Sequence, residues 1–471
     1  MRTLFVSLDT LCATRLSCLG STTVHTPNLD AFASDAAVFR HTFATDIPTQ
    51  PSHTALFTGR SGISTGIVSH FHPPACLDED VSWMPSVFQS SGYRTAAVDH
   101  LFSMKQWFIR GYDDYMVPPG RSRSPASVIR GMAEPWLDAH RDEDFFLFLH
   151  FWDAHIPYVP PEPFKSIYTG PFVDRLDVGI SDKLMSRPSY PLFKRNLYDH
   201  LDRLPNLEYI EALHHAEIAY LDHELGGLFN RLDDLGILDD MMIVVFGDHG
   251  EIMTDHDAWF DHAGLYDSVV RVPLMIRAPG VVPPMATDAL VGLIDVAPTI
   301  YELLGPELAT GTGLEVMEGR SLVPLMEGRA DHHREAVYLS ECTWQAKRGV
   351  RTAEWKYIRC WDPGIYPRNE PELYHLPTDP DEQVNLARLR PDVVSALDSR
   401  LEGWLAAGLD ARPDPMLEVV SYGLPAVARL RAVIEEEQAE SVAPLIDLRS
   451  RAASPARGGR PRIGVLGAST G

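Results

Sequence analysis

Acidic residues stand where three short apolar runs of the sequence end. Asp9 follows LFVSL, Asp153 follows FFLFLHFW with His155 two residues further on, and Asp248-His249 follows MMIVVFG. Ligands of open α/β sheets bind beyond the carboxyl ends of the strands, so these side chains are expected to meet at one edge. Carboxylate and imidazole ligands suit zinc, manganese or magnesium. Each acid alone is also typical of a turn or a helix N-cap, but three together, two of them joined to histidine, indicate a metal site.

The segment that follows Asp248 is rich in histidine. The stretch GDHGEIMTDHDAWFDHAGLYD holds His249, His256 and His262 among several aspartates. Polar loops seldom carry three histidines so close together, which favours metal ligands or proton donors. A solvated acidic loop and a pH-sensitive surface loop are the alternatives.

A candidate nucleophile lies between the strand ends, in the segment TDIPTQPSHTALFTGRSG. Pro48 and Pro51 favour an extended entry followed by a helix, which places Thr49 at the helix N-terminus. The free N–H groups and the helix dipole there favour a bound anion and a developing alkoxide. A threonine hydroxyl becomes a good nucleophile only when a metal ion or a base lowers its pKa. Thr49 is therefore either a nucleophile or an ordinary N-cap residue.

The apolar periodicity predicts the scaffold that must position these residues. Over about the first 310 residues, strand-like runs alternate with helical patterns, which indicates a mostly parallel sheet with helices on both faces. The predicted strands are Leu4–Leu8, Thr95–Val98, Phe145–Phe151, Met242–Phe246 and Pro273–Ile276, and the predicted helices include Pro27–Phe39, Tyr209–Leu232 and Val296–Leu304.

The pattern changes after about residue 335 to short antiparallel strands and a helix over Pro391–Leu405. We therefore expect a catalytic α/β domain over residues 1–335, a smaller α+β subdomain over 336–410, and a helical extension with a tail over 411–471. The tail from Arg449 to Gly471 has the composition of a loosely docked segment. A helix predicted over Pro425–Glu437 would pack within the chain or join the subunits of a homo-oligomer.

The charge balance excludes several classes of partner. The 471 residues include 41 Lys and Arg against 65 Asp and Glu, a formal charge of −24, which opposes binding to nucleic acid or to an anionic membrane. A small anionic substrate is compatible if a metal ion or an Arg/His cluster reverses the sign inside a pocket. The sequence shows neither a membrane span nor the pattern of a secretory signal. Five cysteines without a C-x-x-C pair indicate a reduced, cytoplasmic protein.

A collinear series of motifs resembles the sulfatase branch of the alkaline phosphatase superfamily, over about residues 1 to 390. The series comprises TPNLDAFASDAAVFRHTFA, LFTGR, GYRTAAV, FLHFWDAHIPYVPP, VVFGDHGE, GLYDSVVRVPLMIRAPG, VGLIDVAPTIYELLG and ELYHLPTDPDEQVNLA. The resemblance implies an α/β fold in which helices sandwich a large, mostly parallel sheet, with a smaller C-terminal α+β subdomain. It also implies a hydrolase that acts on ester bonds of a small anionic substrate.

Departures from the family pattern fall on residues that carry the chemistry. The family has C-x-P-S-R, or Ser in place of Cys, and converts the first residue to formylglycine, whereas this chain has Thr49-Gln50-Pro51-Ser52-His53. Threonine cannot become formylglycine, and here it resembles the phosphodiesterases and phosphotransferases of the superfamily. The family's Asp-Asp pair is Asp9-Thr10, as in the phosphonate monoester hydrolase branch, and its Lys before G-x-L-Y is His262.

The resemblance implies roles for the matching positions. Asp9, Asp248 and His249 would bind a divalent ion that also contacts the Thr49 oxygen; zinc or manganese is expected, and magnesium or calcium is compatible. Thr49 would attack phosphorus to give a covalent phospho-threonine. The oxyanion contacts and the proton transfer to the leaving group would come from His155 and His262.

A second set of candidates would hold a second metal ion or contact the substrate. It consists of Asp153, His256, His53 and His70.

The favoured function is metal-dependent hydrolysis of a phosphodiester, a phosphomonoester or a phosphonate monoester. Hydrolysis of sulfate esters without formylglycine and transfer of the phospho group to an acceptor alcohol are the alternatives within the enzymes. A non-catalytic metal-binding protein is the alternative outside them, and the retention of Asp9, Thr49, Asp248 and His249 argues against it.

Overall fold

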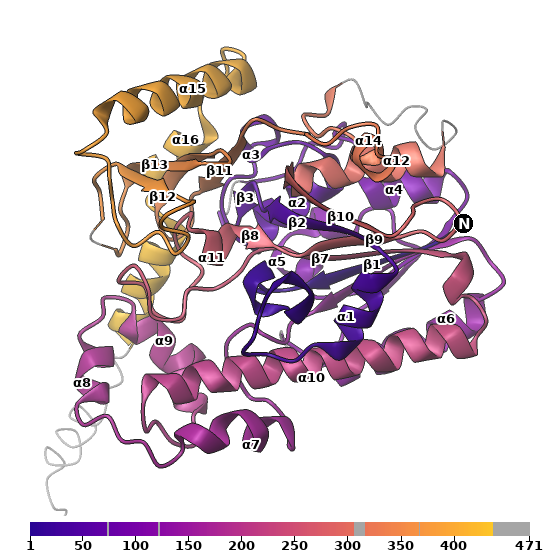
Figure 1. Cartoon of the computed structure of the whole chain (residues 1–471), viewed down its shortest axis with the longest axis horizontal. Coiled ribbons are helices and arrows are strands. Elements are labelled where there is room, and N and C mark those ends of the chain that lie inside the picture. Colours follow the sequence, from indigo (N-terminus) through magenta and orange to yellow (C-terminus); the bar gives the residue numbers. More distant parts are fainter. Residues whose placement is uncertain (73–74, 121–122, 306–315, 367, 437–471) are drawn as a thin grey trace, which may run out of the picture.

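The computed structural model describes residues 1–72, 75–120, 123–305, 316–366 and 368–436. A nine-stranded sheet with the order β10-β2-β9-β7-β1-β6-β4-β5, in which β8 also pairs with β2, forms its centre (Figure 1). Five neighbours, from β7 to β5, run parallel, whereas β9 is antiparallel to β7 and β2. The strands are β1 (Arg2–Leu8), β2 (Ala37–Phe43), β4 (Arg94–Val98), β5 (Asp114–Met116), β6 (Phe145–Phe151), β7 (Met241–Gly247), β8 (Arg271–Val272), β9 (Leu274–Arg277) and β10 (Met285–Gly292).

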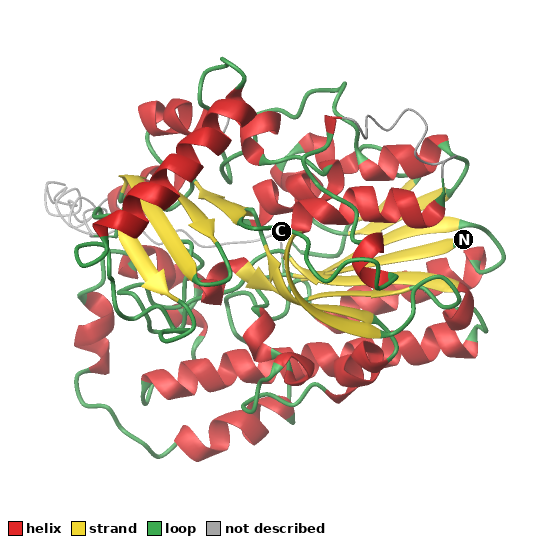
Figure 2. Ribbon diagram, turned by 45° about the horizontal axis from the view of Figure 1, so that its top comes forward, coloured by secondary structure: helices red, strands yellow, loops and turns green. Residues whose placement is uncertain are grey.

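Helices cover both faces of this sheet (Figures 1 and 2). Alternate side chains of a strand point to opposite faces, so Leu4 and Val6 of β1 join one apolar core and Phe5 joins the other. The first core packs under α1 (Pro27–Ser34), α6 (Ala126–His140) and α10 (Leu207–Asp234), and the second under α2 (Thr49–Thr58), α4 (Met84–Ser90) and α12 (Val296–Leu304).

A second, smaller sheet lies beside the first and has the order β14-β13-β12-β11-β3. Its last four strands in the sequence are antiparallel, while β11 pairs in parallel with β3, which belongs to the segment just before α2. This pairing ties the smaller sheet directly to the segment that carries Thr49. The elements are β3 (Asp46–Ile47), β11 (Val337–Glu341), β12 (Ala346–Arg351), β13 (Trp355–Asp362) and β14 (Glu372–His375), covered by α15 (Pro391–Leu409).

The architecture confirms the predicted α/β fold, and most predicted elements stand where the periodicity placed them. The helix predicted over Pro27–Phe39 is wrong in its second half, because α1 ends at Ser34 and β2 begins at Ala37. Val38 and Phe39 are typical strand residues, and β2 completes its hydrogen bonds with β10 and β9. The predicted tail over Arg449–Gly471 lies outside the described residues.

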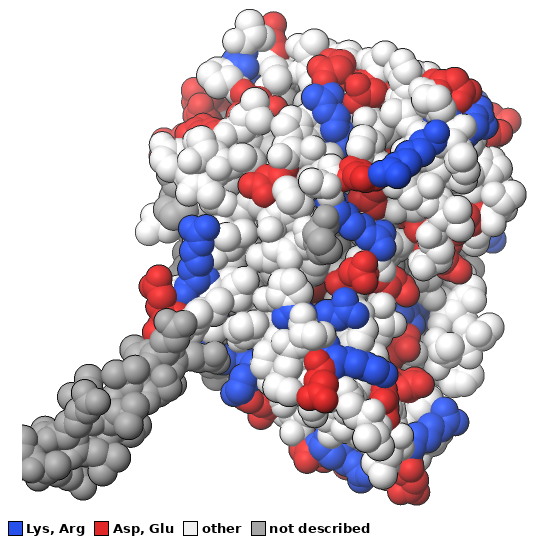
Figure 3. Space-filling model, turned by 90° about the vertical axis from the view of Figure 1, so that its left-hand side faces the viewer, with Lys and Arg blue, Asp and Glu red and all other residues white. Residues whose placement is uncertain are grey.

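Acidic and basic side chains are interspersed over the face of the molecule shown in Figure 3. Within the described part of the chain, no helix combines the length and the apolar character that crossing a membrane requires. All five cysteines are free thiols. The absence of nucleic-acid partners stays a prediction from the net charge.

A buried carboxylate braces the elements against which α2 packs. Asp295, at the start of α12, is fully buried and accepts hydrogen bonds from the Gly292 and Arg320 backbone N–H groups at 2.9 and 2.8 Å. Its ion-pair partners are Arg334, whose Nε lies 2.8 Å from Asp295 Oδ2, and His333, whose Nε2 lies 3.1 Å from the same oxygen. Burial opposes the ionised carboxylate, but these partners hold the pKa of Asp295 well below its ordinary value.

We expect Asp295→Asn to lower the free energy of unfolding by roughly 3 kcal/mol at neutral pH, because it leaves a buried guanidinium uncompensated. A carboxylate with a lowered folded pKa stabilises the protein above its unfolded pKa of about 4, and this contribution is lost as the pH falls through the folded value. In urea unfolding, the difference in the free energy of unfolding between the wild type and Asp295→Asn should therefore be constant down to about pH 5. It should become smaller below about pH 4.

Asp288→Asn is the matched control, because Asp288 is exposed and lies 3.5 Å from Arg40 in a surface ion pair. It should change the free energy of unfolding by less than about 1 kcal/mol. If the difference in the free energy of unfolding between Asp295→Asn and the wild type grew as the pH fell, the pKa of Asp295 would not be lowered in the folded protein.

Candidate active site

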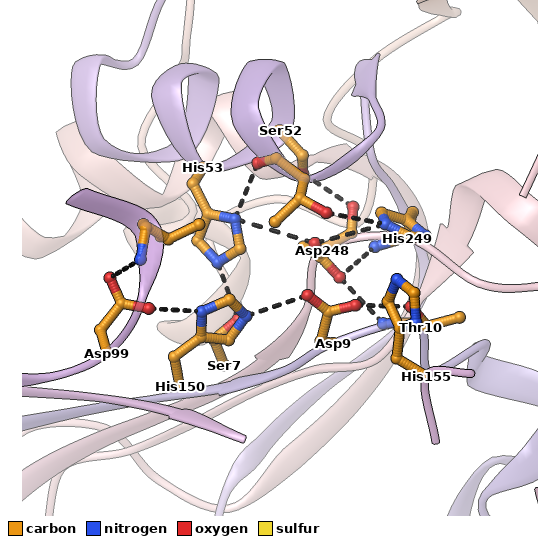
Figure 4. A network of polar contacts seen from close by, with 12 residues as sticks. Ser7, Asp9, Thr10, Ser52, His53, Asp99, His150, His155, Asp248 and His249 are labelled. Atoms are coloured by element: carbon orange, nitrogen blue, oxygen red, sulfur yellow. Dashed lines mark hydrogen bonds and ion pairs between the residues drawn. The ribbon is translucent and has the colours of Figure 1, made fainter. Parts of the chain in front are cut away.

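Two carboxylates meet at the carboxyl ends of adjacent strands. β1 and β7 pair in parallel with Leu8 opposite Gly247, so the next residues, Asp9 and Asp248, stand side by side. Ligand atoms of Asp9, Asp248 and His249 all lie within 4.8 Å of one another, and all three residues are buried (Figure 4). The structure thus brings together three of the predicted metal ligands.

The electrostatics of this cluster fit a bound cation. Burial and the neighbouring Asp9 charge raise the pKa of Asp248 to about 6. Asp248 Oδ1 accepts the backbone N–H groups of Thr10 and His249 at 3.1 and 2.8 Å, whereas Oδ2 has no hydrogen-bond donor among the described residues. A buried carboxylate oxygen without a donor, beside a second carboxylate, is the environment that a divalent cation stabilises.

The His249 ring turns its Nε2 atom toward Thr49. Its Nδ1 lies 3.0 Å from the Gly250 carbonyl oxygen, and because a carbonyl only accepts, Nδ1 carries the proton. In the neutral ring Nε2 then holds the lone pair, and this nitrogen lies 3.2 Å from Thr49 Oγ1. This arrangement suits a metal ligand that shares its ion with the threonine oxygen, since ligating histidines usually donate their other nitrogen to a carbonyl or carboxylate.

Helix α2 fixes the position of Thr49 because it is buried along its whole length. Its polar side chains find partners inside the protein: Ser52 Oγ donates to the Asp248 carbonyl at 2.7 Å, and His53 Nδ1 donates to the Thr49 carbonyl at 2.8 Å. The helix ends at Gly59, whose left-handed φ of 66° provides the C-cap. Thr49 is the first residue of this helix, as predicted.

His53 is a neutral bridge within the core. Its Nε2 lies 2.9 Å from Ser7 Oγ, so both ring nitrogens are occupied by hydrogen bonds. Burial lowers its pKa to about 3, with a smaller contribution from His150. The ring holds the Thr49 carbonyl through Nδ1. Because Ser7 occupies Nε2, neither ring nitrogen has a lone pair available for a second metal ion.

A cationic histidine that the sequence did not reveal, His150, lies between Asp9 and Asp99 (Figure 4). His150 Nε2 lies 3.1 Å from Asp9 Oδ2, and Nδ1 lies 2.7 Å from Asp99 Oδ1. Burial opposes the charged ring, but these two hydrogen bonds raise the pKa of His150 to about 10. His150 therefore compensates part of the negative charge of the cluster. In the sequence, the presence of a histidine within the otherwise apolar run FFLFLHF could have indicated that His150 is a buried, paired residue.

Three more predicted histidines face the same space as Thr49. His70, His155 and His262 line one cavity of about 840 Å³ with it. The ring centroid of His262 lies 4.7 Å from that of His249 and 5.6 Å from that of His155. Burial lowers the pKa of each of the three, which keeps them neutral at physiological pH and able to exchange protons.

Two members of the second candidate set lie away from this cluster. Asp153 is buried near Glu217 of α10, and burial raises its pKa to about 7. His256 stacks on Tyr266 with ring centroids 3.6 Å apart, toward the smaller sheet. Neither is among the residues that group with Asp9 or line the cavity.

Glu251 and Arg123 also belong to the site but were not predicted. Glu251 accepts a 2.7 Å hydrogen bond from the Tyr158 hydroxyl, lies 3.7 Å from His262 Nδ1, and has a pKa that burial raises to about 8. Its position directly after the GDHG motif was a usable signal. Arg123 lies in the loop before α6, where nothing in the local sequence indicates a binding residue.

Fold and site together define an α/β protein with a candidate metal centre beside a helix-borne hydroxyl. A family model described as "Sulfatase" matches residues 2–306, and one described as "N-sulphoglucosamine sulphohydrolase, C-terminal" matches residues 255–405. The chain belongs to the sulfatase family. It is thus an enzyme of the sulfatase superfamily that acts on ester bonds, in a family whose members bind a divalent metal ion.

Two curated relatives illustrate the range of this similarity. N-acetylglucosamine-6-O-sulfatase of Bacteroides thetaiotaomicron is 22% identical over 81% of this chain and 82% of its own length. Choline-sulfatase of Rhizobium meliloti is 30% identical over 51% of this chain and 46% of its own length, so this alignment spans about half of either protein.

Solved structures show the same fold. The phosphonate monoester hydrolase of Agrobacterium radiobacter superposes with a TM-score of 0.70 at 20% identity, covering 87% of this chain and 96% of that one. A protein solved with its substrate D-glucosamine-2-N,6-O-disulfate superposes with a TM-score of 0.71 at 20% identity, covering 88% of this chain and 99% of that one.

We expect the purified wild type to bind one divalent ion, and Asp248→Asn to weaken that binding by at least about a hundredfold, because it removes a charged ligand. Equilibrium dialysis with metal analysis measures this directly. The melting temperature gives a second measurement, since an ion at a thousand times its Kd stabilises a protein by about 4 kcal/mol.

Asp222→Asn provides the matched control. Asp222 is also buried, but it accepts hydrogen bonds from the Leu29 backbone and the Asn28 side chain on the far side of the sheet. This variant should bind the ion as the wild type does. Equal ion binding by Asp248→Asn and the wild type would show that the cluster is not the metal site.

Proposed function

We propose that the protein hydrolyses phosphate or phosphonate esters with Thr49 as the nucleophile. The observation that carries this proposal is the buried Thr49 hydroxyl, held 3.2 Å from His249 Nε2 at the first position of α2. In the family pattern this position holds the residue that becomes formylglycine. A threonine there retains a secondary alcohol, which can attack phosphorus once its pKa is lowered.

The side chains of this protein account for both halves of such a reaction. A divalent ion held by Asp9, Asp248 and His249 would supply Lewis acidity and lower the pKa of a nearby hydroxyl. Thr49 gives up its hydroxyl proton to the solvent, and its Oγ1 forms the bond to phosphorus while the bond from phosphorus to the leaving oxygen breaks. The free N–H groups at the start of α2 and the Arg123 guanidinium stabilise the phosphoryl oxygens.

Proton transfer falls to the two histidines of the cavity. His262 relays a proton to the leaving oxygen: Glu251, which burial keeps protonated with a pKa of about 8, lies 3.7 Å from His262 Nδ1 and supplies the proton to that nitrogen, while the other ring nitrogen passes its own proton on. His155 Nδ1 lies 2.9 Å from the Ile156 carbonyl and so carries the proton, which leaves Nε2 to accept one. His155 thus takes a proton from the water that attacks phosphorus and returns it to Thr49 Oγ1 as the bond from phosphorus to that oxygen breaks.

Sulfate esters are the second candidate substrates, because the curated relatives named above are sulfatases. The Thr49 side chain cannot become formylglycine, which argues for phosphorus as the preferred reaction centre. Transfer to an alcohol would use the same phospho-threonine, and added glycerol would then give glycerol phosphate as a product.

We expect Thr49→Ala to lower kcat/KM for the preferred ester by roughly a thousandfold or more, because it removes the attacking oxygen. Thr49→Ser should retain most of the activity. The measurement is a panel of 4-nitrophenyl esters (phosphate, methyl phosphate, phenylphosphonate and sulfate) on both variants and the wild type, with divalent ions added.

Thr54→Ala is the control on the same helix. Thr54 is buried like Thr49, but its hydroxyl donates to the Gln50 carbonyl inside α2. It should leave the turnover of the panel within a few-fold of the wild type. A dominant sulfatase activity that survives Thr49→Ala would rule out the proposed nucleophile.

A further inference from the structure

The cavity above Thr49 is walled by segments that lie far apart in the sequence. Besides the histidines, its walls come from the residues after β6, from helix α9 (Tyr190–Asn196), from the loop between β11 and β12, and from the helix over residues 425–436. This last helix is the one predicted over Pro425–Glu437, and it packs within the chain. Of these walls, the loop between β11 and β12 makes hydrogen bonds to two of the segments that carry cavity histidines.

Glu341, the last residue of β11, is the hydrogen-bond centre of this loop. Its side chain is fully buried, and its Oε1 accepts the backbone N–H groups of Trp344 and Gln345 at 2.8 and 3.0 Å. Its Oε2 accepts the Gly264 N–H at 3.2 Å. Because Gly264 lies two residues after His262, one carboxylate joins the loop to the segment that carries this histidine. The three donors are held in place, since a buried N–H without an acceptor costs free energy.

Thr343, two residues after Glu341, makes the second connection. Its Oγ1 accepts the His70 backbone N–H at 2.8 Å and lies 3.3 Å from Ser69 Oγ. Its carbonyl accepts the Ala426 N–H at 3.1 Å, which joins the loop to the 425–436 helix as well. His70 Nδ1 is buried and finds no hydrogen-bond partner among the described residues. Thr343 therefore holds His70 through its backbone, and the ring lines the cavity.

The strand that carries Glu341 also pairs with the segment that leads to Thr49. β11 runs parallel to β3, and Glu341 lies opposite Ile47, two residues before Thr49. The Trp344 ring adds a side-chain contact, since it lies edge to face with the His262 ring at a centroid separation of 5.7 Å. The loop is therefore registered on the segment before Thr49 and joined by hydrogen bonds to the segments of both histidines.

We propose that Glu341 and Thr343 are positioning residues of the active site, which fix His262 and His70 relative to Thr49. Both act through the backbone of the segments that carry the histidines. The inference rests on the proposed function only in taking these two histidines as groups that meet the substrate. It makes the smaller sheet a part of the active site and not only a neighbour of the larger one.

Double-mutant cycles on kcat/KM test each connection, because the effect of a positioning residue disappears once the residue that it positions is removed. The substrate is the ester of the panel that the wild type hydrolyses fastest. Thr343→Val should lower kcat/KM by about tenfold in the wild type and by less than about twofold in the His70→Ala variant. Thr343→Ser keeps the hydroxyl and should stay within about twofold of the wild type.

Glu341→Gln is the corresponding variant for His262. The glutamine keeps one oxygen for the N–H groups of Trp344 and Gln345, but its amide turns N–H donors toward the Gly264 N–H, which breaks that connection. We expect a loss in kcat/KM of about tenfold in the wild type and of less than about twofold in the His262→Ala variant.

Thr299→Val and Asp222→Asn are the matched controls. The buried Thr299 Oγ1 accepts the Leu322 N–H at 2.8 Å, the buried Asp222 carboxylate accepts the Leu29 N–H at 2.8 Å, and neither residue lines the cavity. Each control removes a hydrogen bond of the same kind. Both should lower the melting temperature but leave kcat/KM within about twofold of the wild-type value.

If Thr343→Val or Glu341→Gln lowered kcat/KM by the same factor with and without its histidine, the role given to that residue would be overturned. A loss no larger than that of the matched control would overturn it as well. The Thr343 cycle is complete by itself, so it decides the inference even if Glu341→Gln fails to fold. An activity that survives Thr49→Ala would end the proposed mechanism and would still allow both cycles to be measured. The two proposals therefore fail separately.

Discussion

The repulsion between two buried carboxylates is the constraint around which this structure is arranged. The parallel pairing of β1 with β7 places Asp9 and Asp248 side by side, in a region where water cannot screen them. The protein supplies part of the compensation itself through His150, which Asp99 holds from the opposite side. The remaining charge, together with an Asp248 oxygen that finds no donor among the described residues, fits a cation in the position that Thr49 also faces.

The position of Thr49 depends on contacts made far from it. Helix α2 lies wholly inside the protein, and its hydroxyls and imidazole are hydrogen-bonded to its own backbone, to Ser7 and to Asp248. It packs against the elements that Asp295 holds together, and β3, just before it, joins the smaller sheet. Both sheets therefore contribute to the placement of one hydroxyl group.

Local patterns predicted the fold, and they selected three residues that the structure groups at the strand ends, Asp9, Asp248 and His249. Continuous apolar runs marked the buried strands, and the acids at their ends were found because parallel strands present these ends at one edge. Residues with no local signature were missed: Arg123 enters the site from a loop, and its role depends on tertiary proximity alone. Asp153 and His256 were selected for their neighbours in the sequence, but their side chains point elsewhere, since chain proximity does not fix direction.

The division of labour between the strand ends and the cavity walls has an evolutionary consequence. The candidate metal ligands follow β1 and β7, whereas Trp344, Phe193 and Arg429 come from a loop and two helices that contribute none of them. Mutations of these three side chains can reshape the preferred alcohol while the catalytic machinery remains intact. With such a layout, related enzymes can evolve different substrate specificities while the reaction mechanism stays the same.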